Sequence, residues 1–120
     1  MKTSIELLTE QELPQGFQYP RQFRRVVDLG LIDLEPWYLL GGKPLRDTKS
    51  GLAERYPARN LIPFARRQDN DDIACWQIGK NEEVFIIHDF AEPGWEQRGQ
   101  FADFYGWFRR AIEDLIKFDG

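Results

Sequence analysis

Two side chains in this sequence could form a catalytic pair: His88 and Cys75, the only histidine and the only cysteine of the chain. A cysteine nucleophile needs a general base within hydrogen-bond reach and a cation or helix N-terminus that lowers its thiol pKa. Neighbouring strands could bring the two residues together, but Cys75 lies in an apolar run without basic neighbours. We therefore expect an inert, buried thiol and a structural or rim histidine, for which Asp89 is a candidate partner.

Carboxylate and amide oxygens gather in a second place, the run Asp69-Asn70-Asp71-Asp72. A calcium loop requires alternating oxygen ligands, a central glycine and a distal glutamate, whereas this run has consecutive acids and no glycine in register. One histidine and one cysteine are too few for a zinc site. We predict no metal, no cofactor and no catalytic residue. The run favours a hairpin turn, and its functional alternative is an acidic docking patch.

Tryptophan side chains form a third candidate group. Trp37 lies in a predicted edge strand, Trp95 in a predicted loop, and Trp107 beside the apolar stripe of a predicted helix, on an exposed flank. Large aromatics at the rim of a core usually belong to the core, but tryptophan also anchors protein interfaces. The candidate partner-binding residues are the acids of the turn and two of these tryptophans: Asp69, Asp71, Asp72, Trp95 and Trp107.

Residues 60–90 should position these side chains. Three apolar runs, 61–65, 73–78 and 84–90, are separated by two polar turns. This pattern is typical of an antiparallel meander. We expect most of the sheet's contribution to the core from these strands: Leu61, Ile62, Phe64, Ile73, Cys75, Ile78, Phe85 and Ile87.

Helical patterns flank the meander. Residues 100–118 carry the clearest apolar stripe, which includes Phe104 and Phe108. Residues 20–29 predict a second helix, with Pro20 in its first turn and Gly30 as its stop.

The remaining segments give weaker patterns. Residues 3–13 could form a short helix, and residues 32–40 indicate an edge or irregular strand because of Pro36. Residues 44–59 fit either one or two helical turns or a long loop. Strands followed by a covering helix predict an α+β fold. We expect a single domain with a mostly antiparallel or mixed sheet, helices packed on one face, and the C-terminal helix closing the core.

The bulk composition narrows the classes of partner. The chain has 120 residues, 42% of them hydrophobic, and a formal net charge of −4, with a pI near 5.0. This size fits one domain over 1–120, with a core of about residues 14–117. An acidic chain with small basic clusters argues against nucleic acid and suits a basic protein partner. No apolar run could span a membrane and the N-terminus does not fit a signal peptide, so we expect a cytoplasmic protein.

The order of these motifs resembles the SMI1/KNR4 (SUKH) superfamily. The resemblance covers most of the chain. The chain departs from the family pattern in the short region after Gly42, where many members have a longer or differently placed insertion. The motifs that carry it follow the Trp-bearing strand: LIPFA (61–65), the acidic turn, IACW (73–76), VFIIHDF (84–90), GWE (94–96) and the aromatic helix FYGWFRRAIED (104–114).

The resemblance implies an α+β fold and a protein-binding role without catalysis. Many bacterial members are immunity proteins that neutralise toxins, and fungal members regulate cell-wall synthesis and signalling. We therefore expect an immunity protein, and a basic toxin domain would suit its acidic charge. A regulatory scaffold is one alternative, and a small hydrolase or ligand-binding enzyme that uses His88 and nearby acids is another. The resemblance transfers no interface, and the oligomeric state stays open.

Overall fold

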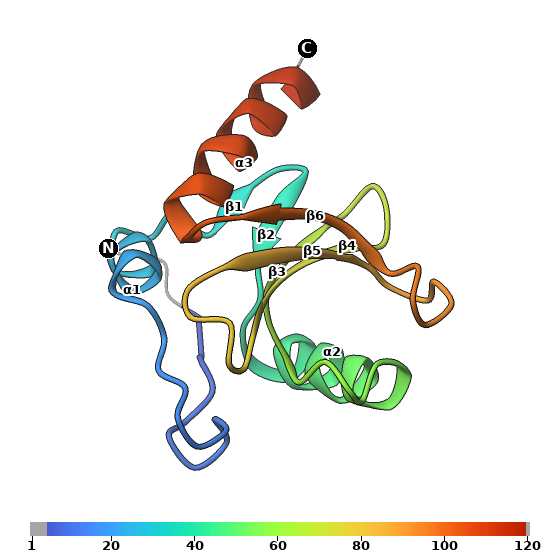
Figure 1. Cartoon of the computed structure of the whole chain (residues 1–120). Helices are drawn as coiled ribbons and strands as arrows, with labels where there is room; N and C mark the ends of the chain where they lie inside the picture. Colours follow the sequence, from blue (N-terminus) through green and yellow to red (C-terminus); the bar gives the residue numbers. More distant parts are fainter. Residues whose placement is uncertain (1–4, 120) are drawn as a thin grey trace.

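The apolar runs of residues 60–90 form the centre of a six-stranded sheet in the computed structural model, which describes residues 5–119 (Figure 1). The strands lie in the order in which they occur in the chain, and every neighbouring pair is antiparallel. The predicted α+β fold and its meander are confirmed. The elements are α1 (Arg21–Asp28), β1 (Asp33–Leu34), β2 (Trp37–Leu39), α2 (Gly42–Arg55), β3 (Leu61–Arg67), β4 (Asp72–Gln77), β5 (Val84–His88), β6 (Gln97–Phe101) and α3 (Phe104–Asp119).

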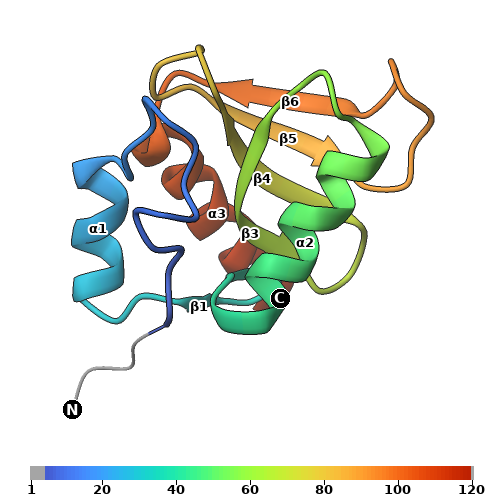
Figure 2. The ribbon, with the colours of Figure 1, turned by 90° about the horizontal axis from the view of Figure 1, so that it is seen from below.

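Helices cover both faces of this sheet (Figures 1 and 2). On one face, which we call the α3 face, α1, α3 and the segment before α1 pack over Phe64 and Trp76. On the other, the α2 face, Leu52 and Tyr56 from the end of α2 pack over Cys75. We predicted helices on one face; the structure corrects this detail, because α2 lies opposite α1 and α3.

The predicted sheet core is confirmed except at Ile78, which is only half-buried. Because the sheet is covered on both faces, its central strands are apolar on both sides and do not alternate with polar residues. The prediction missed further buried strand residues, among them Ala65, Ala74, Trp76, Val84 and Ile86.

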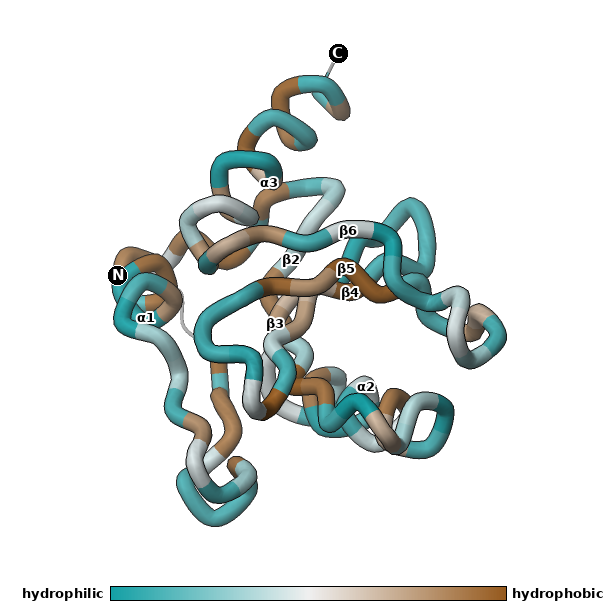
Figure 3. Tube along the Cα trace, in the orientation of Figure 1, coloured by the Kyte–Doolittle hydropathy of each residue, from teal (hydrophilic) through white to brown (hydrophobic). Residues whose placement is uncertain are grey.

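The C-terminal helix closes the core as predicted, but it begins later and its buried stripe is rotated. Residues 97–101 belong to β6, and the Asp103 carboxylate caps the helix by accepting a hydrogen bond of 2.8 Å from the Gly106 N–H. The buried side chains are centred on Phe104 and Trp107, whereas Phe108 is half-buried. Strand β6 was not predicted because it is an edge strand with mostly hydrophilic residues (Figure 3).

The helix predicted over 20–29 is confirmed as α1, whereas the segments with weaker patterns differ from their predictions. Residues 5–13 form no helix; Thr9 and Glu12 exchange hydrogen bonds of 2.9 and 3.3 Å around a single turn, and residues 3 and 4 lie outside the described part. Residues 32–40 contain the short hairpin β1–β2. Residues 42–55 form one helix whose pattern is sparse, since only Leu45 and Leu52 are buried.

None of the helices described within residues 5–119 has the length and the apolar character needed to cross a membrane.

The rotated position of the buried stripe on α3 leads to a prediction about the stability of two variants. Phe104→Ala should lower the free energy of unfolding by about 3–5 kcal/mol because it leaves a cavity in the core. Phe108→Ala should cost only about 1–2 kcal/mol because its ring is half-buried. Urea denaturation measures both variants, and equal losses would contradict the position of this helix.

Candidate protein-docking site

Three connections of the meander meet at one end of the sheet, because antiparallel pairing places every second connection on the same side. They are the β1–β2 turn (35–36), the β3–β4 loop (68–71) and the β5–β6 loop (89–96). The Gln68 N–H donates to the Pro36 carbonyl at 2.8 Å, and the Asp89 N–H donates to the Asp71 carbonyl at 2.9 Å. We call this region, which is visible in Figure 1, the loop end.

The predicted acidic residues all lie at the loop end, but each has a partner within the chain. Asp69 accepts hydrogen bonds of 2.8 and 2.9 Å from the Arg67 guanidinium, which holds the pKa of Asp69 below its usual value. Asp71 lies 3.4 Å from an arginine of β3, and Asp72 Oδ1 lies 2.9 Å from His88 Nδ1. Each of these carboxylates is therefore paired within the chain, while the Asp71 side chain stays 52% exposed, and their role as an acidic docking patch stays a prediction.

The interpretation of this run as a hairpin turn is confirmed. It joins the antiparallel strands β3 and β4, and the Asp72 N–H donates to the Asn70 side-chain oxygen at 2.8 Å. Within residues 5–119, no group of three or more His, Cys, Asp or Glu side chains is placed to hold a metal ion.

His88 and Cys75 do not form a catalytic pair. His88 is opposite Asp72 in the β4–β5 register and lies on the α3 face, whereas Cys75 belongs to the core on the α2 face. The histidine ring is held by Asp72 rather than by Asp89. Burial raises the pKa of the Cys75 thiol, which agrees with the expected inert cysteine.

The two candidate tryptophans have opposite environments. Trp107 is fully buried and its ring centroid lies 4.9 Å from that of Phe64, so its predicted position on an exposed flank is wrong. Trp95 is 78% exposed in the β5–β6 loop. Phe90, in the same loop, is 64% exposed; we did not single it out because it ends an apolar run and looks like a core residue in the sequence.

Two buried carboxylates hold the two ends of the β5–β6 loop. Asp89 is 2% exposed and accepts hydrogen bonds of 2.6 and 2.8 Å from the Arg55 guanidinium. Glu96 is 7% exposed and accepts hydrogen bonds of 3.0 Å from Arg59 and 2.6 Å from the Gly94 N–H. A buried carboxylate destabilises a fold unless it is paired, so these interactions fix the loop to the end of α2 and the segment after it.

Phe90 is held in an unfavourable backbone conformation. Its φ angle is 68°, a region that bulky residues avoid, at a cost of about 1–3 kcal/mol. The Arg55 guanidinium carbon lies 4.2 Å from the centre of its ring, and the Tyr56 hydroxyl donates to the Ala91 carbonyl at 2.7 Å. Strain of this kind persists only where surrounding contacts impose it, and it concentrates at functional sites.

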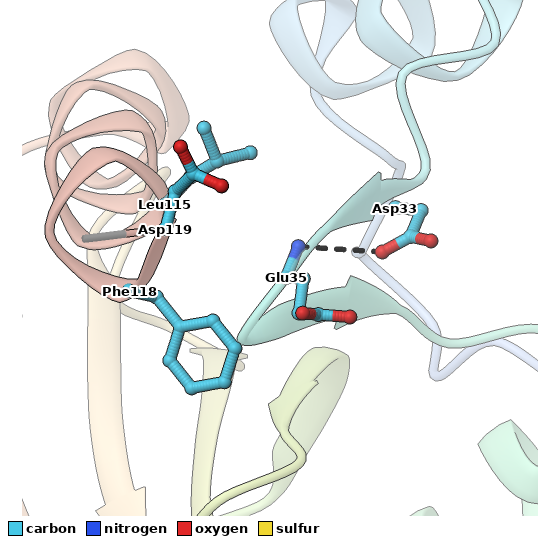
Figure 4. Close-up of a pocket in the computed structure, with 5 residues that line it drawn as sticks. All are labelled: Asp33, Glu35, Leu115, Phe118 and Asp119. Carbon is cyan, nitrogen blue, oxygen red and sulfur yellow. Dashed lines mark hydrogen bonds between the residues drawn. The ribbon is translucent and has the colours of Figure 1, made fainter.

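A groove of about 450 Å³ adjoins the loop end, between the β1–β2 hairpin and the last turns of α3 (Figure 4). One wall carries Asp33 and Glu35, and the other carries Leu115, Phe118 and Asp119. None of the three acids has an ion-pair partner among residues 5–119. The groove therefore combines apolar surface with unpaired negative charge. This combination suits a lysine or arginine side chain of a partner, which has an apolar stem and a charged end.

Comparisons of the chain with protein-family models, with curated proteins and with solved structures find no match. The SMI1/KNR4 resemblance therefore stays a hypothesis, and the site is defined by its geometry.

The ion pair between Arg55 and Asp89 leads to a second prediction about stability. Arg55→Met should lower the free energy of unfolding by about 2–3 kcal/mol, because it leaves the buried Asp89 carboxylate without its main partner. Lys43→Met is the matched control: Lys43 lies 2.6 Å from Asp47 on an exposed helix surface, and its loss should change stability little. Equal effects in urea denaturation would show that the Arg55 pair does not hold the loop.

The lowered pKa of Glu96 predicts how the stability of the protein changes at acid pH. Burial raises the pKa of this carboxyl, but hydrogen bonds from its own N–H, the Gly94 N–H and Arg59 outweigh burial and lower the pKa from its ordinary value of 4.5. Its stabilising effect is therefore present above about pH 4.5 and is lost as the pH falls through the lowered pKa. The stability difference between wild type and Glu96→Gln should shrink across this range in pH-dependent denaturation, and a constant difference would contradict the ion pair.

Proposed function

We propose that this chain is a non-enzymatic protein-binding domain that docks a basic protein partner through its loop end and the adjoining groove. The observation that carries the proposal is the β5–β6 loop, which presents Phe90 and Trp95 to solvent on a backbone held by two ion pairs whose carboxylates are buried. A surface that is already ordered loses little conformational entropy on binding, and tryptophan is enriched among residues that dominate binding energy.

The charge distribution supports a basic partner. The acids of the β3–β4 loop, Asp69 and Asp71, are paired with arginines of β3. Asp33, Glu35 and Asp119 in the groove have no ion-pair partner among the described residues. The formal net charge of the whole chain is −4. A basic partner would therefore be attracted over a distance and would find unpaired carboxylates beside the aromatic loop.

Neutralisation of a basic toxin is the form of this function that the SMI1/KNR4 resemblance favours. A regulatory scaffold would use the same surface for a different partner. The hydrolase alternative has less support, since the ring of His88 is hydrogen-bonded to Asp72 and, among residues 5–119, to no nucleophilic side chain. A single buried thiol at Cys75 suits the reducing cytoplasm proposed for this chain.

The function can be tested with the product of the neighbouring gene as the candidate partner. Association and dissociation rates of the purified pair should be measured at two salt concentrations. Trp95→Ala should raise the dissociation rate by about tenfold or more, because it removes an aromatic anchor. Glu35→Lys should slow association and weaken its dependence on salt, because it reverses a charge that attracts the partner.

Two matched variants control for general effects. Leu29→Ala removes another exposed apolar side chain, and Glu82→Lys reverses a charge at the opposite end of the sheet. Both should bind like wild type, and thermal melts should show that all four variants fold. Wild-type rates for Trp95→Ala and Glu35→Lys would contradict the proposed surface. A toxic neighbour that this chain neither binds nor neutralises would contradict the immunity form of the function.

A further inference from the structure

A second cavity, of about 150 Å³, lies between α3 and the β5–β6 edge of the sheet. The β5–β6 register shifts between Ile86 and Ile87, and Arg98 lies at this irregularity next to Gly99. Such bulges redirect a side chain and are frequent beside functional sites. Arg98, Gly99 and Ile86 all line the space, which we call the Arg98 cavity.

Asp114, one acid of the cavity wall, is already satisfied by other residues. Its carboxylate accepts hydrogen bonds from the Trp37 indole at 3.0 Å, from Arg110 at 3.3 Å and from Arg67 at 3.4 Å. Three donors around one carboxylate leave it little capacity to bind an additional cation.

Arg98 is the charged group of the cavity that has no such partner. Asp72, the other acid of the wall, is paired with His88 at 2.9 Å. Among residues 5–119, Arg98 makes no ion pair within 4.0 Å. Arg98 lines the cavity and is also exposed to solvent, so the open side of the cavity presents an unpaired guanidinium. A guanidinium is the group best suited to bind a carboxylate through two parallel hydrogen bonds.

Trp107 adds a second unsatisfied group to the cavity wall. Its side chain is fully buried, and its indole Nε1 has no hydrogen-bond partner in the described part of the chain. The indole of Trp76 is also unpaired, but Trp76 does not line this space. Buried N–H groups without a partner are rare, so the Trp107 indole is a candidate hydrogen-bond donor to a bound ligand.

We propose that the Arg98 cavity binds a small carboxylic acid with an apolar body. The carboxylate accepts hydrogen bonds from the Arg98 guanidinium and the Trp107 indole N–H, and the apolar body lies against Ile86 and Phe101. The volume of about 150 Å³ is below the 300 to 1,000 Å³ that is typical of sites for larger ligands. The carboxylate could belong to a free organic acid or to a glutamate side chain of a bound peptide.

The test uses the full chain labelled with ¹⁵N, with benzoate as the probe and benzamide as its neutral match. The indole N–H signals of the four tryptophans are assigned by single Trp→Phe variants. Benzoate should shift the Trp107 and Trp37 signals saturably and leave that of Trp95 unchanged, whereas benzamide should bind more weakly by about tenfold. A capped peptide with one central glutamate between alanines is titrated in parallel.

Three variants test which groups of the protein bind benzoate. Arg98→Gln should weaken benzoate binding by about tenfold, and the control Arg109→Gln, which removes an exposed arginine of α3 outside the cavity, should not. Gly99→Ala should also weaken binding while leaving Arg98 in place, because its methyl group would stand 3.4 Å from the Ile86 Cγ1 atom, at the wall of the cavity.

Binding of benzoate alone would assign the cavity to a free acid, and binding of the peptide as well would assign it to a protein carboxylate; both outcomes support the carboxylate chemistry. The proposal is overturned if benzoate causes no saturable shift, if benzamide binds equally well, or if Arg98→Gln binds benzoate like wild type. None of these results depends on the loop end, so the proposed docking function is tested separately.

Discussion

Aromatic packing around Phe64 is the interaction on which the rest of the structure depends. The centre of its ring lies 4.3 Å from that of Trp76 on the next strand and 4.9 Å from that of Trp107 on α3. Phe23 on α1 and Phe104 on α3 lie 5.7 and 5.4 Å away. Aromatic pairs at such separations contribute about 0.5–1.5 kcal/mol each beyond the area that they bury. One strand residue thus joins both helices of the α3 face to the centre of the sheet.

This core fixes the strands, and the strands fix the loop end. Since the sheet is antiparallel throughout, alternate connections come to one side, where backbone hydrogen bonds join them. The loop with Phe90 and Trp95 receives its order from the other face, because Arg55 and Arg59 reach it from the end of α2 and the segment after it. The fold and the exposed loop are therefore held by different residues: the aromatic core holds the fold, and two ion pairs hold the loop.

The sequence predicted the parts of the fold that have long apolar patterns and missed those that depend on contacts between distant residues. The meander and α3 were evident from their periodicity, whereas β6 is mostly hydrophilic and α2 fully buries only Leu45 and Leu52. The acidic turn was recognised, but its pairing with arginines of β3 depends on where the hairpin places each side chain. Asp89 and Glu96 meet their arginines across 34 and 37 residues of sequence, so no local pattern could show that they are buried and paired.

A preorganised docking surface requires the β5–β6 loop to be ordered before any partner binds, and a ¹⁵N relaxation measurement on the free protein shows directly whether it is. If the two ion pairs hold the loop, the backbone order parameters of residues 89–96 should match those of the neighbouring strands, at about 0.85. Values below about 0.6 in this loop would show that it is mobile and would contradict a preorganised docking surface.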